Sequence, residues 1–419
     1  MSERGAIDAP RTESALNDRI LIRGETIMDR YLLISSDCHA GPLPDQARGY
    51  VSPKFRDAFD AWVGDVEGKQ RRRAEHTGAA IYGDEAVADF DVDVTDQGSQ
   101  MAGGWDSKQR LEEMNRDGVV AEVIYPGASL ETITPFDVGL MTYQYQQAAE
   151  LWFEGCRAYN RWLADFCSEV PGRRAGVGLV TVDDIDATVS EIRWMRANGL
   201  TGGIVLPIDT NGHPYYNHPR YEPLWAVCED LDLPIHAHVG WTPNYGDYKG
   251  SLGIFLSEIT WWGRRPLHFL IWSGVFERHP KLRFVMTEMG ATWVVPELED
   301  LDKKYEMPMF RHLRRELPRP PSEYFARNCF MGAAFMAGDV VGIRHEIGVD
   351  KLMWGSDYPH IEGTWPHTAE KLAEAFTGVS QDECQKMLGG NAAEVYGFDV
   401  DLLAKHAAEV GPKADCIGA

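Results

Sequence analysis

Short apolar segments alternate with longer amphipathic segments along almost the whole chain. Eight apolar runs have the length and the branched or aromatic composition of buried strands. The stretches between them, such as "SKQRLEEMNRDG" and "DDIDATVSEIRWMRANG", place apolar residues at helical spacing. The expected strands cover residues 31–37, 119–126, 174–180, 202–207, 233–239, 282–288, 328–333 and 351–357.

This alternation predicts a (β/α)8 TIM barrel, because each strand is followed by a segment long enough to form a helix that returns to the next parallel strand. A doubly wound sheet is the main alternative. No glycine-rich phosphate loop follows any of the eight expected strands, and its absence disfavours that fold. We therefore expect one barrel over residues 31–400.

Four segments depart from the regular repeat. Residues 1–30 form a polar N-terminal extension, and residues 401–419 a polar C-terminal tail that we expect to pack loosely. Residues 61–104 are predicted to be an insertion after the first helix, and residues 240–262 a long, aromatic-rich loop after strand five. Loops that follow barrel strands lie on the catalytic face, so both inserted loops are candidate lids or pocket walls. Surface decoration is the simpler interpretation for 61–104.

The composition limits the possible partners and the compartment. The 419 residues are 44% hydrophobic, which allows a large core, and the formal net charge is −23. Such a charge disfavours nucleic acid and anionic membranes as partners. Seven scattered cysteines without a C-x-x-C pair favour a reducing compartment, and the sequence shows no secretory signal or transmembrane run. We expect a cytoplasmic protein that acts on a small molecule.

Acidic and imidazole side chains stand at the ends of four expected strands. The carboxyl ends of barrel strands meet at one mouth, so these groups are expected to converge there. A single Asp-x-His pair is more often a cap or a turn, but matching groups on strands one, five, six and eight favour a functional site. In chain order they are Asp37, His39, His236, His238, Glu288, Asp357 and His360.

Imidazoles and carboxylates together are the usual ligands of a catalytic zinc or manganese ion that keeps a position open for water. We predict one divalent ion, zinc in the first place and manganese as the alternative. His236 and His238 share one face of a strand but lie at different depths, so we take His238 as the ligand and His236 as a buried, hydrogen-bonded residue. Glu288 is either a further ligand or a base beside bound water. The other predicted ligands are Asp37, His39 and Asp357.

Several motifs resemble the amidohydrolase-related family typified by aminocarboxymuconate semialdehyde decarboxylase, within the amidohydrolase superfamily of metal-dependent barrels. "WGSDYPH" resembles its strand-eight signature, and "LPIHAHVG" resembles its strand-five metal histidine. "RLEEMNRDGVVAEVIYP", "YEPLWAVCEDLDLPIHAH" and "SGVFERHPKLRFVMTEMGATWV" extend the resemblance from about Leu32 to about Gly397. The resemblance implies a metal-dependent enzyme that forms a homodimer, with Asp357 as the group that shuttles the proton.

Two positions depart from the family pattern. The first family motif is commonly His-x-His or Glu-x-His, whereas Asp37 occupies the first ligand position here. On strand six the resembled decarboxylases carry a histidine that helps to protonate or orient the substrate, and Glu288 stands at that position. An additional anion beside the metal would repel a substrate carboxylate.

The sequence therefore predicts first a metal-dependent hydrolase, in which metal-bound water attacks a carbonyl-type centre and a C–N, C–O or C–C bond breaks. The alternative is a non-oxidative decarboxylase of an aromatic or muconate-like acid. A third possibility, a non-catalytic binding protein, is disfavoured because every expected ligand position holds a competent residue. The predicted catalytic residues are Asp357, Glu288 and His360.

Basic and aromatic residues near strands five and eight are candidates for substrate binding. Arg264 and Arg265 either fix a substrate carboxylate through paired hydrogen bonds or form a basic pair on the surface. Trp241, Trp262 and Trp365 either form an apolar wall for a ring-containing substrate or belong to the packed core.

Overall fold

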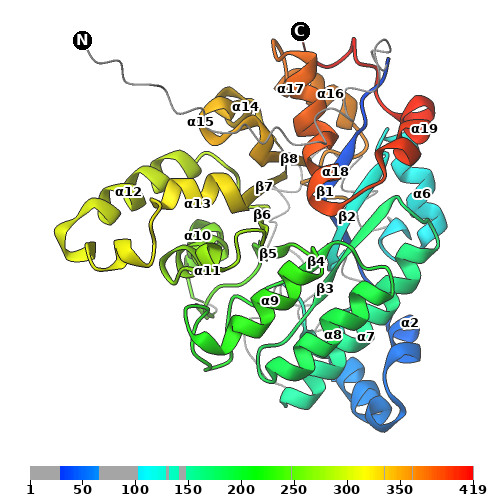
Figure 1. Ribbon diagram of the computed structural model, residues 1–419. Helices are drawn as coiled ribbons and strands as arrows, with labels where there is room; N and C mark the ends of the chain where they lie inside the picture. The colour runs from blue at the N-terminus through cyan, green and yellow to red at the C-terminus, as the bar shows by residue number, and fades with distance from the viewer. Residues whose placement is uncertain are drawn as a thin grey trace, which may run out of the picture.

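Eight parallel strands follow one another in chain order and curl into a barrel with helices around its outside (Figure 1). This computed structural model describes residues 29–65, 102–128, 132–140, 148–246, 248–334, 336–360 and 362–418. The chain folds as the predicted (β/α)8 barrel. The strands are β1 (Ile34–Ala40), β2 (Ala121–Pro126), β3 (Arg174–Leu179), β4 (Gly203–Val205), β5 (Ile235–His238), β6 (Phe284–Thr287), β7 (Cys329–Ala334) and β8 (Leu352–Gly355).

The barrel closes where the chain after β8 meets β1. A parallel bridge joins Cys38 to Tyr358. The amide of Asp357 donates to the carbonyl of Asp37 at 2.8 Å, and the amide of His39 donates to the carbonyl of Tyr358 at 2.7 Å. Closure therefore brings the acid and imidazole of β1 next to the acid that follows β8.

Helices cover the outer face of the barrel with their apolar sides. In the long helix α7 (Ala149–Ser168), buried Trp152, Cys156, Tyr159 and Leu163 recur at helical spacing and face the strands. The helices are α2 (Pro44–Tyr50), α6 (Ser107–Arg116), α7 (Ala149–Ser168), α8 (Ile185–Ala197), α9 (Glu222–Asp230), α10 (Ser251–Trp272), α11 (Val275–Arg278), α12 (Val294–Glu306), α13 (Pro321–Asn328), α14 (Gly338–Gly342), α15 (Arg344–Ile347), α16 (Thr368–Ala375), α17 (Gln381–Gln385), α18 (Asn391–Tyr396) and α19 (Val400–Val410).

Each expected strand overlaps an observed one with small differences at its ends, and two expected segments differ most from the structure. Strand β1 covers Ile34–Ala40 rather than residues 31–37, because the amide of Tyr31 bonds the carbonyl of Pro412 and so pairs with the C-terminal segment. The long loop expected over 240–262 ends at Gly250, and α10 begins at Ser251. "SLGIFLSEITWW" spaces its apolar residues for a helix, and Gly250 supplies the left-handed turn (φ 90°) before it.

The C-terminal segment does not pack loosely, contrary to the expectation from its polar composition. Leu403 and Ala407 of α19 are fully buried, and Ile417 is almost so. The Ile417 carbonyl accepts a hydrogen bond from the Tyr31 hydroxyl at 3.0 Å, and the amide of Ala414 donates to the carbonyl of Asp29 at 2.9 Å. A few apolar residues at helical spacing are enough to bury one side of this segment.

Most of the insertion expected at 61–104, and nearly all of the N-terminal extension, lie outside the described residues, so these divisions of the chain stay predictions. Within the described ranges, no helix is both long enough and apolar enough to cross a bilayer.

Candidate metal centre

Four side chains from three strands meet at the mouth of the barrel. Donor atoms of Asp37, His39, His238 and Glu288 all lie within 4.8 Å of one another. His238 Nε2 is 3.4 Å from Asp37 Oδ1 and 3.5 Å from Glu288 Oε2, and His39 Nε2 is 3.5 Å from Asp37 Oδ1. The side chains of Asp37 and the two histidines are buried, whereas that of Glu288 is 18% exposed.

The two imidazoles are held with the same ring nitrogen toward the centre of this group. His39 Nδ1 lies 3.0 Å from the carbonyl oxygen of Pro126, and His238 Nδ1 lies 2.8 Å from that of Val239. A carbonyl only accepts hydrogen bonds, so each Nδ1 carries the proton and each Nε2 presents its lone pair. This is the usual arrangement of a metal-binding histidine.

Several buried atoms of this group have no hydrogen-bond partner. They are Oδ2 of Asp37, Nε2 of His39 and Oδ2 of Asp357. Unpaired polar atoms in a buried place are costly, and a divalent cation would satisfy all three. The residues present therefore fit a divalent metal ion.

Asp357 lies beside the first four residues and forms neighbouring groups. Its Oδ1 is 3.2 Å from His39 Nε2 and forms a hydrogen bond with His360 Nδ1 at 2.9 Å. Donor atoms of Asp357 and His360 also lie within 4.8 Å of those of Glu288 and Glu362. Donor atoms of His39, Asp357 and His360 form a further group of this kind. The structure thus brings together every acid and imidazole predicted for the mouth except His236, in three overlapping groups.

Burial and neighbouring charges shift the pKa values of three of these groups, upward for Glu288 and His39 and downward for Asp357. Burial, together with the nearby carboxylates of Asp357 and Asp37, raises the pKa of Glu288 well above its usual range. Burial also opposes ionisation of Asp357, but His360 and His39 lower its pKa below the usual range. Burial lowers the pKa of His39, but Asp357 and Asp37 outweigh it and raise that pKa.

Local backbone geometry turns the acids toward the mouth. Glu288 directly follows the end of β6, and Asp357 lies two residues after the end of β8. Both residues adopt positive φ angles, of 58° and 57°. A non-glycine residue in this conformation is strained by about 1–3 kcal/mol, and such residues cluster at functional sites. The register of β1 against β2 also shifts between Ser35 and Cys38, and an irregularity of this kind re-aims the side chains beside it.

His236 lies deeper than His238 and outside the metal-binding groups. Its Nε2 is 2.7 Å from the carbonyl oxygen of Gly202, and its Nδ1 is 2.7 Å from the hydroxyl of Tyr125. Both ring nitrogens are therefore occupied by hydrogen bonds. Burial lowers the pKa of His236 to about 3, so the ring is neutral.

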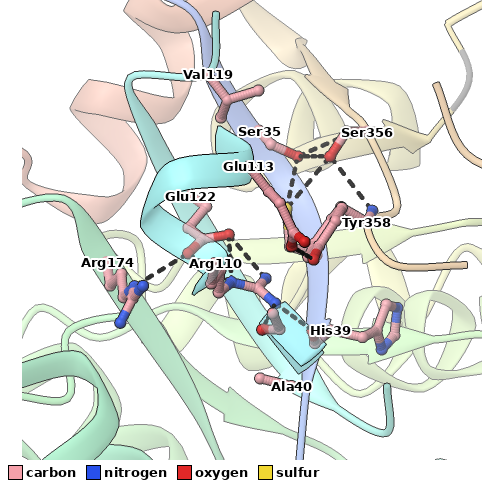
Figure 2. Close-up of polar contacts among 12 residues, drawn as sticks. Ser35, His39, Ala40, Arg110, Glu113, Val119, Glu122, Arg174, Ser356 and Tyr358 are labelled. Atoms are coloured by element: carbon pink, nitrogen blue, oxygen red, sulfur yellow. Dashed lines mark hydrogen bonds and ion pairs between the residues drawn. The ribbon is translucent and has the colours of Figure 1, made fainter. Parts of the chain in front are cut away.

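A buried ion network supports the main chain of His39 from behind (Figure 2). Arg110 of α6 forms paired hydrogen bonds with Glu122 of β2 at 2.7–2.9 Å, and Arg174 of β3 lies 3.1 Å from the same carboxylate. Arg110 Nη1 also donates to the His39 carbonyl at 2.8 Å. Sequence reasoning missed this network, although an acid inside the apolar run "VVAEVIYP" signals a buried partner.

Replacement of Arg110 by methionine is expected to lower the free energy of unfolding by about 3–5 kcal/mol, because it leaves a buried carboxylate with one fewer cation. Urea denaturation of both proteins would measure the difference. Arg48→Met is the matched control, since the Arg48–Asp60 ion pair is on the surface and its loss should have little effect. Equal losses in the two variants would contradict a special role for Arg110.

An apolar pocket adjoins the metal-binding group. It is lined by the ends of β3 and β4 and by α7, including Leu179, Val205 and Trp152. His238, the last residue of β5, and Trp241 of the segment that follows also line it. The pocket has a volume of about 50 Å³.

The other residues predicted to bind substrate do not line this pocket. Trp262 packs edge-on against Trp241 with ring centroids 5.0 Å apart, so it supports the wall from behind. Arg265 lies 4.4 Å from the centroid of the Trp262 ring, and Arg264 lies 5.1 Å from that of Trp293. Trp365 is buried in the separate cluster of Cys38 and Tyr358.

The barrel and its acid–imidazole mouth define a metal-dependent enzyme of the amidohydrolase superfamily. The sequence profile of the amidohydrolase family matches residues 37–398, and the chain belongs to this family.

Curated relatives of the chain are decarboxylases. The chain is 26% identical over 261 residues to gamma-resorcylate decarboxylase of Rhodococcus jostii, an alignment that covers 58% of this chain and 76% of the relative. It is 28% identical over 266 residues to the decarboxylase orsB of Emericella nidulans, covering 60% and 73%. The names of these relatives favour decarboxylation, which was the alternative drawn from the sequence, over hydrolysis.

A solved structure has the same fold. It is the 5-carboxyvanillate decarboxylase of Novosphingobium aromaticivorans with bound manganese, which has a TM-score of 0.62 and 18% identity, and the comparison covers 88% of this chain and 96% of that one.

Proposed function

We propose that this protein is a manganese-dependent, non-oxidative decarboxylase of an aromatic carboxylic acid. One observation carries the proposal: the acid–imidazole group at the barrel mouth shares His238 with an adjoining apolar pocket that is also lined by Trp152 and Trp241. The relatives support the reaction, and manganese in the solved decarboxylase supports the choice of metal.

The residues divide into those that hold the metal and those that hold the ring. Asp37, His39 and His238 are the proposed ligands, and the set is completed by Asp357 or by Glu288, whichever of the two acids does not supply the proton. A divalent ion bound there would supply positive charge that attracts and neutralises the substrate carboxylate. Trp241 and the apolar side chains of β3 and β4 would contact the ring, because they line the pocket beside His238.

The reaction requires a proton donor near the ring carbon that bears the carboxylate. That carbon accepts a proton, its bond to the carboxylate breaks, and the bonding electron pair returns to the ring as carbon dioxide leaves. The acids grouped at the mouth are the available donors, either Glu288 or Asp357 with its hydrogen-bonded partner His360. No oxygen atom of water enters the product.

The labelling pattern of the product separates decarboxylation from hydrolysis. The manganese-loaded protein would be incubated with γ-resorcylate and with 5-carboxyvanillate in D2O, and in a second reaction in H2¹⁸O. We expect released carbon dioxide, deuterium on the ring carbon that lost it, and no ¹⁸O in the aromatic product. Failure of both acids to release carbon dioxide, or ¹⁸O in the aromatic product, would contradict the proposal.

Hydrolysis remains a second candidate because of Glu288. In the resembled decarboxylases this position carries a histidine, whereas here a carboxylate oxygen lies 3.5 Å from His238 Nε2. A carboxylate in this place would accept a proton from an attacking water molecule and return it to the leaving group. The ¹⁸O experiment distinguishes this candidate directly.

A further inference from the structure

Tyr358 ties the chain beside the metal centre to a helix on the outside of the barrel. Its side chain is buried, and its hydroxyl donates a hydrogen bond to the carboxylate of Glu113 on α6 (Figure 2). The preceding residue, Asp357, reaches the mouth instead, with its Oδ1 3.2 Å from His39 Nε2. Two consecutive residues therefore connect the metal-binding groups to a fixed point on the helix layer.

The contact between Tyr358 and Glu113 is closely packed. Gln109 Nε2 donates to the other carboxylate oxygen of Glu113 at 2.9 Å, and the guanidinium carbon of Arg110 lies 4.8 Å from the centroid of the Tyr358 ring. A Cβ atom on Gly103 would overlap both the Tyr358 hydroxyl and the Glu113 carboxylate, so only glycine fits beside the pair. The hydrogen bond is therefore held in one geometry.

The backbone of Asp357 needs support from its surroundings. Its φ of 57° lies in the left-handed region, which residues other than glycine adopt uncommonly and at a cost. Main-chain bonds hold this turn against β1, from the Asp357 amide to Asp37 and from the His39 amide to Tyr358. The Tyr358 side chain holds the same turn from another direction, because it reaches α6 rather than β1. The two holds together fix the direction of the Asp357 carboxylate.

Packing alone does not require a hydroxyl at position 358. A phenylalanine there would fill nearly the same volume and would still lie over the Arg110 guanidinium. The tyrosine instead accompanies a buried carboxylate, Glu113, and burial of that group is costly. A buried polar contact of this kind, when its groups are bonded, specifies one arrangement of the chain.

We propose that Tyr358 and Glu113 are positioning residues for the metal centre, and that their hydrogen bond orients the turn after β8 so that the Asp357 carboxylate faces the ion. Neither is among the described residues that line the pocket beside His238, so neither is expected to contact the substrate. The effect on the rate of decarboxylation rests on the proposed function, whereas the effect on the ion can be measured with manganese alone.

Tyr358→Phe in the manganese-loaded protein tests the proposal, because it removes only the hydroxyl. Without substrate, its Mn²⁺ EPR spectrum should show a changed zero-field splitting, since the groups around the ion are rearranged. Competition with a chelator should show about 10-fold weaker manganese binding, a usual loss when a group that orients a metal ligand is removed. With an acid that the wild-type protein decarboxylates, kcat should fall by about 10-fold and KM should change little.

Variants of Glu113 distinguish positioning from general destabilisation. Glu113→Gln keeps an acceptor for the Tyr358 hydroxyl and should retain the wild-type EPR spectrum and manganese affinity. Glu113→Leu removes the acceptor and should match Tyr358→Phe. The two substitutions Tyr358→Phe and Glu113→Leu together should cost no more than either alone, because the two side chains act through one contact.

Tyr324→Phe is the matched control. It removes the hydroxyl of another buried tyrosine, which donates to Glu277 at 3.0 Å between α13 and α11, the helices that precede β7 and β6. It should lower the free energy of unfolding and leave the EPR spectrum, the manganese affinity and kcat unchanged.

A wild-type EPR spectrum and wild-type manganese affinity in Tyr358→Phe would overturn the proposal, and so would additive losses when Tyr358→Phe and Glu113→Leu are combined. If the wild-type protein releases carbon dioxide from neither acid, the proposed function fails, but the manganese measurements still decide whether Tyr358 and Glu113 position the metal centre. The two proposals can therefore fail separately.

Discussion

Replacement of Asp37 or His238 by alanine is expected to remove the metal ion that the purified protein holds. Each variant loses one buried donor of the group formed by Asp37, His39, His238 and Glu288, and the remaining donors no longer surround an ion. Elemental analysis of the purified wild-type protein should show about one divalent ion per chain, and each variant should show almost none. Activity should fall with the metal content.

His236→Asn is the control for this experiment, because His236 lies next to the metal-binding histidine but makes its own hydrogen bonds to Gly202 and Tyr125. It should lower the stability of the fold more than the metal content. Loss of metal in His236→Asn with full retention in His238→Ala would show that the two histidines have been assigned the wrong way round.

Replacement of Glu288 by glutamine is expected to reduce the rate of carbon dioxide release by about 10²- to 10⁴-fold, the usual contribution of a positioned acid or base. Glutamine keeps the shape of the side chain but neither carries the acidic proton nor accepts one. The rate would be measured with whichever of the two aromatic acids the wild-type protein decarboxylates, and the manganese content would be measured in the same samples.

Glu288→His separates the two candidate reactions further. Histidine carries a transferable proton, so a decarboxylase should keep much more activity in this variant than in Glu288→Gln. A hydrolase that relies on the carboxylate should lose activity in both. Glu299→Gln, an exposed substitution on α12, should behave like the wild-type protein. An unchanged rate in Glu288→Gln would exclude this residue from the chemistry.

The order and number of the strands could be predicted because their apolar composition is a local property of the chain. The precise placement of β1 could not, since it depends on Tyr31 pairing with Pro412, a contact between residues at opposite ends of the described chain. The length of α10 was underestimated because its tryptophans and glycines suggested a loop, whereas its apolar spacing is helical.

The convergence of the mouth residues could be predicted from the geometry of a barrel, since strand ends with acids or imidazoles must meet at one face. The division into overlapping groups could not, because it depends on side-chain positions a few ångströms apart. Glu362 was missed because an acid in a polar loop carries no signal of its own. Arg110 was missed because only its contact with Glu122 distinguishes it from other helical arginines.

The pairing of residues 29–31 with residues 411–417 has a consequence for the order of events during protein synthesis. The ribosome makes β1 first among the strands, yet the segment that holds its N-terminal end, through Tyr31, is made after all eight strands. The backbone hydrogen bonds that join Asp37 to Asp357 and His39 to Tyr358 also cannot form until the chain after β8 has been made. The first two metal ligands therefore reach their final positions only when the whole barrel has emerged, so loading of the metal is expected to follow translation rather than accompany it.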